Sequence, residues 1–260
     1  MMKKLGIYAG IGYPIPIEER IAKIKETGFD LICLDFEKEM EATETSWENQ
    51  LKLADKYSLP VKEAHLTGSG MSSIWQDCEE AKFVCNRLIE ELRDLSELGI
   101  PVGVAHVTWG LGAVNAPNQN ALDYFTKIAE AAEKYKVKLA LENSVSDLHV
   151  RYVLDNIKSD YLGFCYDSGH ENAFTKGADY LDSYSDRLFA MHLHDNNGIK
   201  DNHYPPFDIN GTVDWAKTVE KLKNTDIFKE SVILEVGKQP EPFDDLLKRS
   251  YEAAKKLAEM

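Results

Sequence analysis

Residue types that bind divalent metal ions recur along this chain at the ends of short apolar segments. Six of the seven histidines take part in the pattern, and only His149 stands outside it. Mixed carboxylate and imidazole ligation suits Mn²⁺, Mg²⁺, Co²⁺ and Zn²⁺. The pattern therefore predicts a divalent metal site. Its members are His65, His106, Glu142, Asp167, His170, His192, His194, Asp201, His203 and Glu235.

Two of the carboxylates follow directly on apolar residues. Glu142 comes after Leu-Ala-Leu and Glu235 after Ile-Leu. A buried charged carboxylate is costly unless it is paired or bound to metal, so both positions need compensation. A single residue such as His65 or His106 is more often a hydrogen-bonded core histidine. The prediction rests on the recurrence of such residues at the same end of successive segments.

The elements that would position these residues alternate in type. Because short apolar segments alternate with amphipathic ones, we expect parallel strands joined by right-handed helical crossovers. The apolar segments are too continuous for one-sided antiparallel strands. We expect strands at 5–9, 31–36, 61–66, 102–108, 137–142, 162–166, 189–194 and 232–236, and helices at 16–27, 47–57, 74–98, 120–135, 147–157, 178–184, 213–223 and 243–258.

Eight strand and helix pairs in 260 residues match the size of one α/β barrel. The rival arrangement, a doubly wound open sheet, lacks a GxGxxG after the first strand. We find no linker or repeat. The sequence therefore predicts a single (β/α)8 TIM barrel domain over residues 1–260.

The net charge limits the partners that we expect, and the cysteine usage indicates the cellular compartment. The net charge of −14 disfavours nonspecific attraction to nucleic acid or to anionic membranes. No apolar stretch approaches the length of a membrane span. The four cysteines, Cys33, Cys78, Cys85 and Cys165, form no CxxC pair, and we expect buried free thiols in a cytoplasmic protein.

In a barrel, the residues of the metal-ligand pattern lie near the C-terminal ends of the strands, where barrel enzymes build their sites. His192 and His194 lie two residues apart at the end of a predicted strand, and we expect only one of them to bind the metal ion. We expect His192 to be the ligand, with His194 turned away or towards the rim. His149 is predicted to lie on a helix surface.

Several short motifs resemble the xylose isomerase-like barrel superfamily, which includes sugar isomerases, ketose 3-epimerases and abasic-site nucleases of the endonuclease IV type. The resemblance covers nearly the whole chain. It rests on Leu-Glu-Asn at 141–143, Asp-Ser-Gly-His at 167–170, His-Leu-His-Asp at 192–195, Asp-Asn-His at 201–203, Gly-Thr-Val-Asp-Trp at 211–215 and Leu-Glu-Val at 234–236.

The two branches of this superfamily imply different ligand sets. The ketose 3-epimerase pattern implies one metal ion bound by Glu142, Asp167, His192 and Glu235. The nuclease pattern implies three zinc ions, with further ligands at His65, His106, His170, Asp201 and His203. Residues 195–200 read Asp-Asn-Asn-Gly-Ile-Lys and lack the Arg that the epimerases carry there. The chain also lacks a basic, aromatic loop for a DNA duplex.

By this resemblance, the chain is expected to be a metal-dependent isomerase or epimerase of a sugar or sugar phosphate that works through an enediolate. Glu142 and Glu235 would move protons, and His170 would hydrogen-bond the carbonyl oxygen. Trp109 and Lys200 are the candidate substrate contacts. The alternatives are a zinc phosphodiesterase acting on abasic DNA and an inactive metal- or sugar-binding barrel. A homo-oligomer is expected by analogy.

Overall fold

Eight parallel strands form the centre of the molecule in a computed structural model that describes residues 2–35, 46–110 and 114–260. Neighbouring strands pair in the order β7-β6-β5-β4-β3-β2-β1-β8. Leu193, directly after β7, pairs in parallel with Leu234 of β8 and closes the ring. The strands are β1 (Lys4–Tyr8), β2 (Leu31–Asp35), β3 (Val61–His65), β4 (Val102–His106), β5 (Lys138–Glu142), β6 (Leu162–Asp167), β7 (Leu188–His192) and β8 (Ser231–Leu234). The predicted TIM barrel is confirmed.

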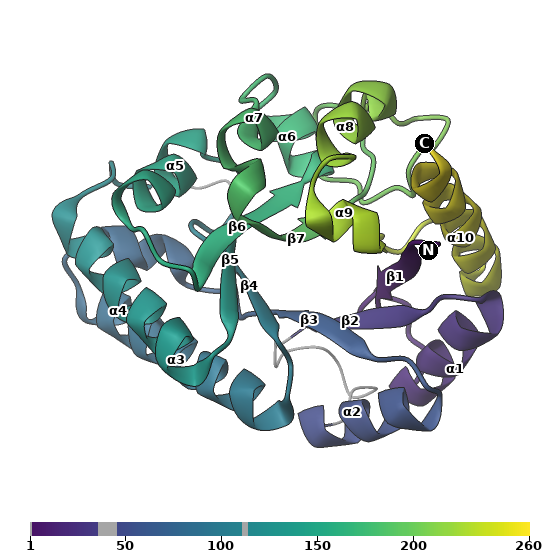
Figure 1. Ribbon diagram of the computed structural model, residues 1–260, viewed down its shortest axis with the longest axis horizontal. Helices are drawn as coiled ribbons and strands as arrows, with labels where there is room; N and C mark the ends of the chain where they lie inside the picture. Colours follow the sequence, from purple (N-terminus) through teal and green to yellow (C-terminus); the bar gives the residue numbers. More distant parts are fainter. Residues whose placement is uncertain (1, 36–45, 111–113) are drawn as a thin grey trace.

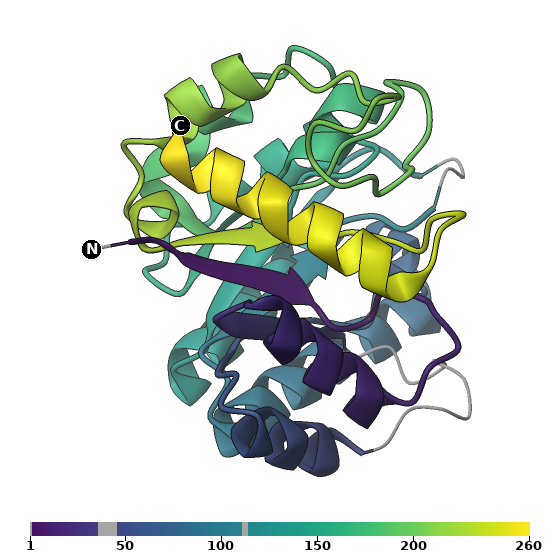
Figure 2. The same cartoon turned by 90° about the vertical axis from the view of Figure 1, so that its right-hand side faces the viewer.

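The helices surround this barrel (Figure 1). In Figure 2 the arrowheads of β1 and β8 point away from the N-terminus, and α10 packs across both strands. The α-helices are α1 (Ile17–Thr27), α2 (Trp47–Lys56), α3 (Glu79–Leu98), α4 (Gln119–Tyr135), α5 (Asp147–Asn156), α6 (Ser168–Phe174), α7 (Tyr180–Tyr184), α8 (Trp215–Leu222), α9 (Asp226–Glu230) and α10 (Phe243–Glu259). Two 3₁₀ helices are η1 (Met71–Trp75) and η2 (Ser185–Arg187).

Helix α3 shows how the sequence specifies this outer layer. Val84, Leu88, Leu92 and Leu95 are fully buried and recur every three or four residues, so they form one apolar face. The helix ends at Gly99, whose φ of 73° is a left-handed conformation that glycine adopts without a steric penalty. Burial of this face holds the helix against the strands.

Inside the barrel, small apolar side chains lie beneath the strand ends. Val104 of β4, Ala140 of β5, Cys165 of β6 and Ala190 of β7 form part of one buried cluster. Each lies two residues before a histidine or carboxylate on the same strand, so both side chains point inward. The ligand-type residues therefore form a layer above an apolar one.

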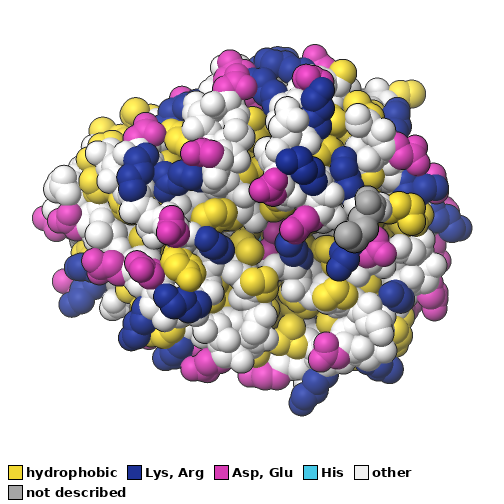
Figure 3. Space-filling view, viewed as in Figure 1, with side chains coloured by type: hydrophobic (Ala, Val, Ile, Leu, Met, Phe, Trp, Pro, Cys, Tyr) yellow, Lys and Arg dark blue, Asp and Glu magenta, His cyan; other side chains and the backbone are white. Residues whose placement is uncertain are grey.

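The opposite end of the barrel is different. Figure 3 shows the face at the N-terminal ends of the strands, where acidic and basic side chains are interspersed with apolar ones. No histidine among the described residues is visible on this face, which agrees with their placement at the other end of the strands.

Several expectations from the sequence need correction. The helix predicted at 74–98 is divided into η1 and α3, because Cys78 has an extended conformation and precedes α3. Cys78 is exposed, so not all thiols are buried, although the four cysteines are free. Helices α6 and α9 were not predicted. Phe36, placed in the second strand, lies outside the described residues. Within the described ranges, no helix is long and apolar enough to cross a membrane.

His149 is the clearest error of the sequence analysis. It is buried rather than exposed, with only 6% of its surface accessible. Its ring nitrogens contact Ser146 Oγ at 2.5 Å and the carbonyl oxygen of Asn115 at 2.9 Å. Its ring also packs edge-on against Trp75. These partners allow a helical histidine to be buried, and the sequence pattern did not reveal them.

Candidate metal centre

Three groups of histidines and carboxylates meet at the C-terminal ends of the strands. Within each group, one ligand atom per residue lies within 4.8 Å of every other. The first consists of Glu142, Asp167, His192 and Glu235, the second of His65, His106 and Glu142, and the third of His170, His194, Asp201 and His203. Every residue of the predicted pattern belongs to one of these groups.

Glu142 of β5 joins the first two groups. Its Oε2 lies 3.1 Å from His65 Nε2 and 3.0 Å from His106 Nε2. Its Oε1 lies 3.2 Å from His170 Nδ1 and 3.2 Å from His192 Nδ1. The carboxylate is fully buried. One carboxylate is therefore surrounded by four imidazoles and contributes to two of the three groups.

The first group converges on the Nδ1 atom of His192. This atom lies 2.9 Å from Glu235 Oε2 and 4.0 Å from Asp167 Oδ2. Asp167 also caps helix α6, because its Oδ1 accepts a hydrogen bond from the backbone N–H of His170. The turn from β6 into α6 thus fixes both residues, which explains their spacing of three.

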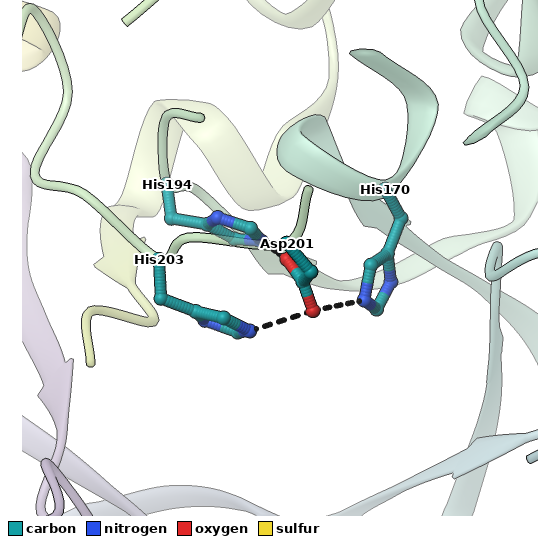
Figure 4. A group of neighbouring side chains, drawn as sticks. All are labelled: His170, His194, Asp201 and His203. Atoms are coloured by element: carbon teal, nitrogen blue, oxygen red, sulfur yellow. Dashed lines mark hydrogen bonds and ion pairs between the residues drawn. The ribbon is translucent and has the colours of Figure 1, made fainter. Parts of the chain in front are cut away.

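The third group lies on the segments that follow β6 and β7 (Figure 4). Asp201 Oδ2 lies between His170 Nε2 at 3.2 Å and His203 Nε2 at 3.0 Å. The rings of His194 and His203 are stacked, with centroids 4.0 Å apart. His194 Nε2 lies 3.0 Å from Asp167 Oδ1, so this histidine links the third group to the first.

The ring of His194 occupies a space that exists because residue 169 is a glycine. A Cβ atom on Gly169 would lie 2.0 Å from the His194 ring. The sequence analysis expected His194 to turn away or towards the rim. Instead it is fully buried and faces Asp167, because the chain stays paired at Leu193 and residues two apart on an extended chain point to the same side.

The charges of the groups depend on one another. Burial opposes ionisation of Glu142, but His106 and His192 hold the pKa of its carboxyl well below the usual range. Burial also opposes a charge on His65, but the hydrogen bond to Glu142 raises its pKa to about 9. His106 differs, because burial lowers its pKa although the Glu142 carboxylate acts to raise it. The centre thus combines charged and neutral imidazoles around ionised carboxylates.

A cavity of about 670 Å³ opens above the centre. His65, His106 and His170 lie at its base, and Glu235 reaches it from β8. Glu142 is not among the lining residues, because the imidazoles cover it. The volume is within the usual range for small-molecule sites, about 300–1,000 Å³.

Both predicted substrate contacts line this cavity. Trp109 is 40% exposed, and its ring lies 5.2 Å from that of His106. Lys200 is the one lysine or arginine among the described lining residues. Phe174, Val145 and Ile199 add apolar surface to the wall.

Sequence reasoning missed two residues beneath the centre, Tyr8 and Glu63. Both are buried and lie near His192 Nε2, on the side of the ring away from the carboxylates. The sequence does contain one indication of Glu63, because this residue stands two positions before His65 and thus faces the same side of β3.

The donor set fits a divalent metal ion. Glu235 Oε2 is buried and makes no hydrogen bond, although it lies 2.9 Å from His192 Nδ1. Buried carboxylate oxygens normally have partners, and a cation between these atoms would supply one. The first group offers three carboxylates and one imidazole, whereas the third offers three imidazoles and one carboxylate. The third group therefore has the composition more suited to Zn²⁺.

Comparison with known proteins decides the family. A model described as xylose isomerase-like TIM barrel matches residues 21–257. The chain belongs to this family. A protein of Sinorhizobium fredii is 40% identical over 90 residues, which cover 34% of this chain and only 28% of that protein.

Solved structures share the fold of this family member over nearly its whole length. A D-tagatose 3-epimerase-like protein superposes with a TM-score of 0.77 at 20% identity, covering 98% of this chain and 97% of its own. An IOLI protein with a bound zinc atom superposes with a TM-score of 0.78 at 15% identity, covering 98% of both chains. At these identities, the likeness establishes the barrel fold.

Proposed function

We propose that this protein is a metal-dependent sugar isomerase or epimerase that moves a proton at the carbon next to a carbonyl. The observation that carries the proposal is the position of Glu235, which belongs to the first metal-ligand group and also lines the cavity. The fold shared with a D-tagatose 3-epimerase-like protein supports the same class of reaction.

The metal ion would be held by Glu142, Asp167, His192 and Glu235. When bound, a divalent ion supplies Lewis-acid polarisation of a substrate carbonyl and stabilises enediolate charge. Glu235 is ionised at neutral pH, because His192 outweighs burial and holds the pKa of its carboxyl well below the usual range. It is therefore in the form that accepts a proton.

The geometry separates the two glutamates that the sequence analysis assigned to proton transfer. Glu235 lines the cavity, whereas Glu142 is covered by the imidazoles of His65 and His106. We therefore assign proton removal to Glu235 and metal binding to Glu142. Return of the proton by Glu235 to the adjacent carbon gives isomerisation, whereas epimerisation also requires a proton donor on the opposite face of the carbon. His170 lines the cavity and donates or accepts at the substrate oxygen, while Trp109 offers an apolar face for C–H groups.

The test is exchange of carbon-bound hydrogen in D₂O, followed by NMR with a panel of free and phosphorylated ketoses and aldoses. Glu235→Gln should abolish exchange and keep metal bound to the remaining ligands. Glu142→Gln should lose both metal and exchange. Deuterium incorporated at the carbon that lost its hydrogen, with inverted configuration, identifies an epimerase, and deuterium incorporated at the neighbouring carbon identifies an isomerase. Full exchange in Glu235→Gln would contradict the assignment.

A second candidate function is a zinc-dependent phosphodiesterase. The presence of three adjoining groups favours it, because a sugar epimerase is expected to need only the first group and would leave the other two unexplained. The charge of the cavity argues against it, since Asp35, Asp201 and Glu235 face a single lysine, Lys200. Chelator-sensitive cleavage of a duplex containing an abasic site would support this candidate. Metal binding with neither cleavage nor exchange would indicate an inactive barrel.

A further inference from the structure

Glu63 is a buried carboxylate that the proposed reaction does not use. It lies on β3, is fully buried, and points into the barrel below the layer of metal-ligand residues. Its Oε2 atom has no hydrogen-bond partner. Because an unsatisfied buried charge is costly, such a group calls for a functional explanation.

The other oxygen of Glu63 connects it to the metal centre through His192. Glu63 Oε1 accepts a hydrogen bond of 3.3 Å from the Tyr8 hydroxyl, and Tyr8 Oη lies 2.9 Å from His192 Nε2. Glu63 Oε1 itself lies 3.4 Å from the same nitrogen. With the Glu63 carboxylate as the acceptor, one arrangement satisfies both hydrogen bonds: Tyr8 O–H donates to Glu63, and His192 Nε2–H donates to Tyr8.

This arrangement determines which nitrogen of His192 is free to bind metal. With the proton on Nε2, the Nδ1 atom presents its lone pair to the side where Glu142, Asp167 and Glu235 lie. The ring of Tyr8 packs edge-on against the imidazole, with centroids 5.0 Å apart and an angle of 81°. Tyr8 and Glu63, which lie below His192, thus determine both the orientation of its ring and its tautomer.

We propose that Glu63 and Tyr8 are positioning residues that orient His192 and increase the basicity of its Nδ1 atom as a metal ligand. This inference rests on the metal centre proposed above. A carboxylate behind a ligating histidine commonly contributes about 10–100-fold in metal affinity. Glu63 therefore strengthens metal binding without touching the metal or the substrate, and its buried charge lowers the stability of the metal-free protein.

Opposite effects on two measurements test this proposal. Glu63→Leu should weaken Co²⁺ binding by about 10–100-fold in a calorimetric titration. In EDTA, the same variant should unfold at an equal or higher urea concentration than wild type, because a buried charge has been removed. Glu63→Gln retains an acceptor for Tyr8 and should lose less affinity than Glu63→Leu. Tyr8→Phe should also weaken binding, with an altered visible spectrum of bound Co²⁺.

Tyr180→Phe is the matched control for Tyr8→Phe. Tyr180 is fully buried with an unpartnered hydroxyl, but it packs against Phe164 and Arg151 outside the metal centre. It should leave Co²⁺ affinity unchanged. Equal Co²⁺ affinity in wild type, Glu63→Leu and Glu63→Gln would overturn the proposal, as would a parallel loss of affinity and metal-free stability. If Glu63→Leu does not fold, Glu63→Gln and Tyr8→Phe give the same comparison. Wild-type protein that binds no Co²⁺ would instead refute the proposed metal centre.

Discussion

Replacing Glu142 by glutamine tests the electrostatic coupling at the core of the site. The substitution keeps the size of the side chain but removes the charge that faces His65, His106, His170 and His192 at 3.0–3.2 Å. In the metal-free protein, this carboxylate is what raises the pKa of His65 to about 9 against the effect of burial. Without it, burial remains and should lower the pKa of His65 below 6.5.

The size of the effect follows from these two values. A fall from about 9 to 6.5 or less, at about 1.36 kcal/mol per pH unit, corresponds to about 3 kcal/mol or more for the protonated form of His65. Because the folded pKa is raised, this stabilisation is fully present below pH 6.5 and is lost as the pH rises through 9. Metal-free wild type should therefore lose more stability between pH 6 and pH 10 than Glu142→Gln.

The assay is NMR titration of the histidine Cε1–H groups in EDTA-treated protein, with His65→Gln used to assign the resonance. His149 provides an internal control, because it contacts Ser146 and Asn115 and lies outside the three groups. Its chemical shift should not change in Glu142→Gln. A His65 that still titrates near pH 9 in the variant would refute the proposed role of Glu142, as would a wild-type His65 that titrates below 6.5.

Two further predictions concern the third group and proton competition. Gly169→Ala should displace His194, since the added Cβ would lie 2.0 Å from its ring, and elemental analysis should show loss of metal from this group. Gly177→Ala is the control: its Cβ would meet no atom within 4 Å, and although its φ of 83° strains an alanine, the variant should retain the full metal content. Metal uptake at pH 7 should release protons, because Glu142 raises the pKa of His65 to about 9 and Asp201 that of His203 to about 10 despite burial. Calorimetry in buffers of different ionisation enthalpy measures this proton release. The metal affinity should rise roughly tenfold per pH unit for each proton displaced, and a metal affinity that does not change with pH would contradict the prediction.

The barrel could be predicted because its signals are local. Each strand is a short apolar run, and the amphipathic spacing of segments such as α3 is visible in the sequence. The predicted boundaries of helices were wrong where a single residue departs from the regular pattern. Cys78 is extended and divides a predicted helix, and the short helix α6 begins directly at the end of β6 without a loop.

The ligand-type residues could also be identified, but their partners could not. Tyr8 of β1 meets His192 of β7, which lies beyond β8 in the barrel and 184 residues away in the sequence, and no local pattern indicates such a contact. His149 was misplaced for the same reason, because its partner Asn115 belongs to a different loop. The covering of Glu142 by His65 and His106 likewise depends on how three strands pack together.

The central claim is that Glu142, Asp167, His192 and Glu235 hold a divalent metal ion. The most direct test is elemental analysis of protein purified without chelator, in parallel for wild type and Glu142→Gln. We predict at least one tightly bound divalent ion per chain in the wild type, with loss of metal in Glu142→Gln because this carboxylate belongs to two of the three groups. Wild-type protein without metal that also takes up none on titration would contradict the account.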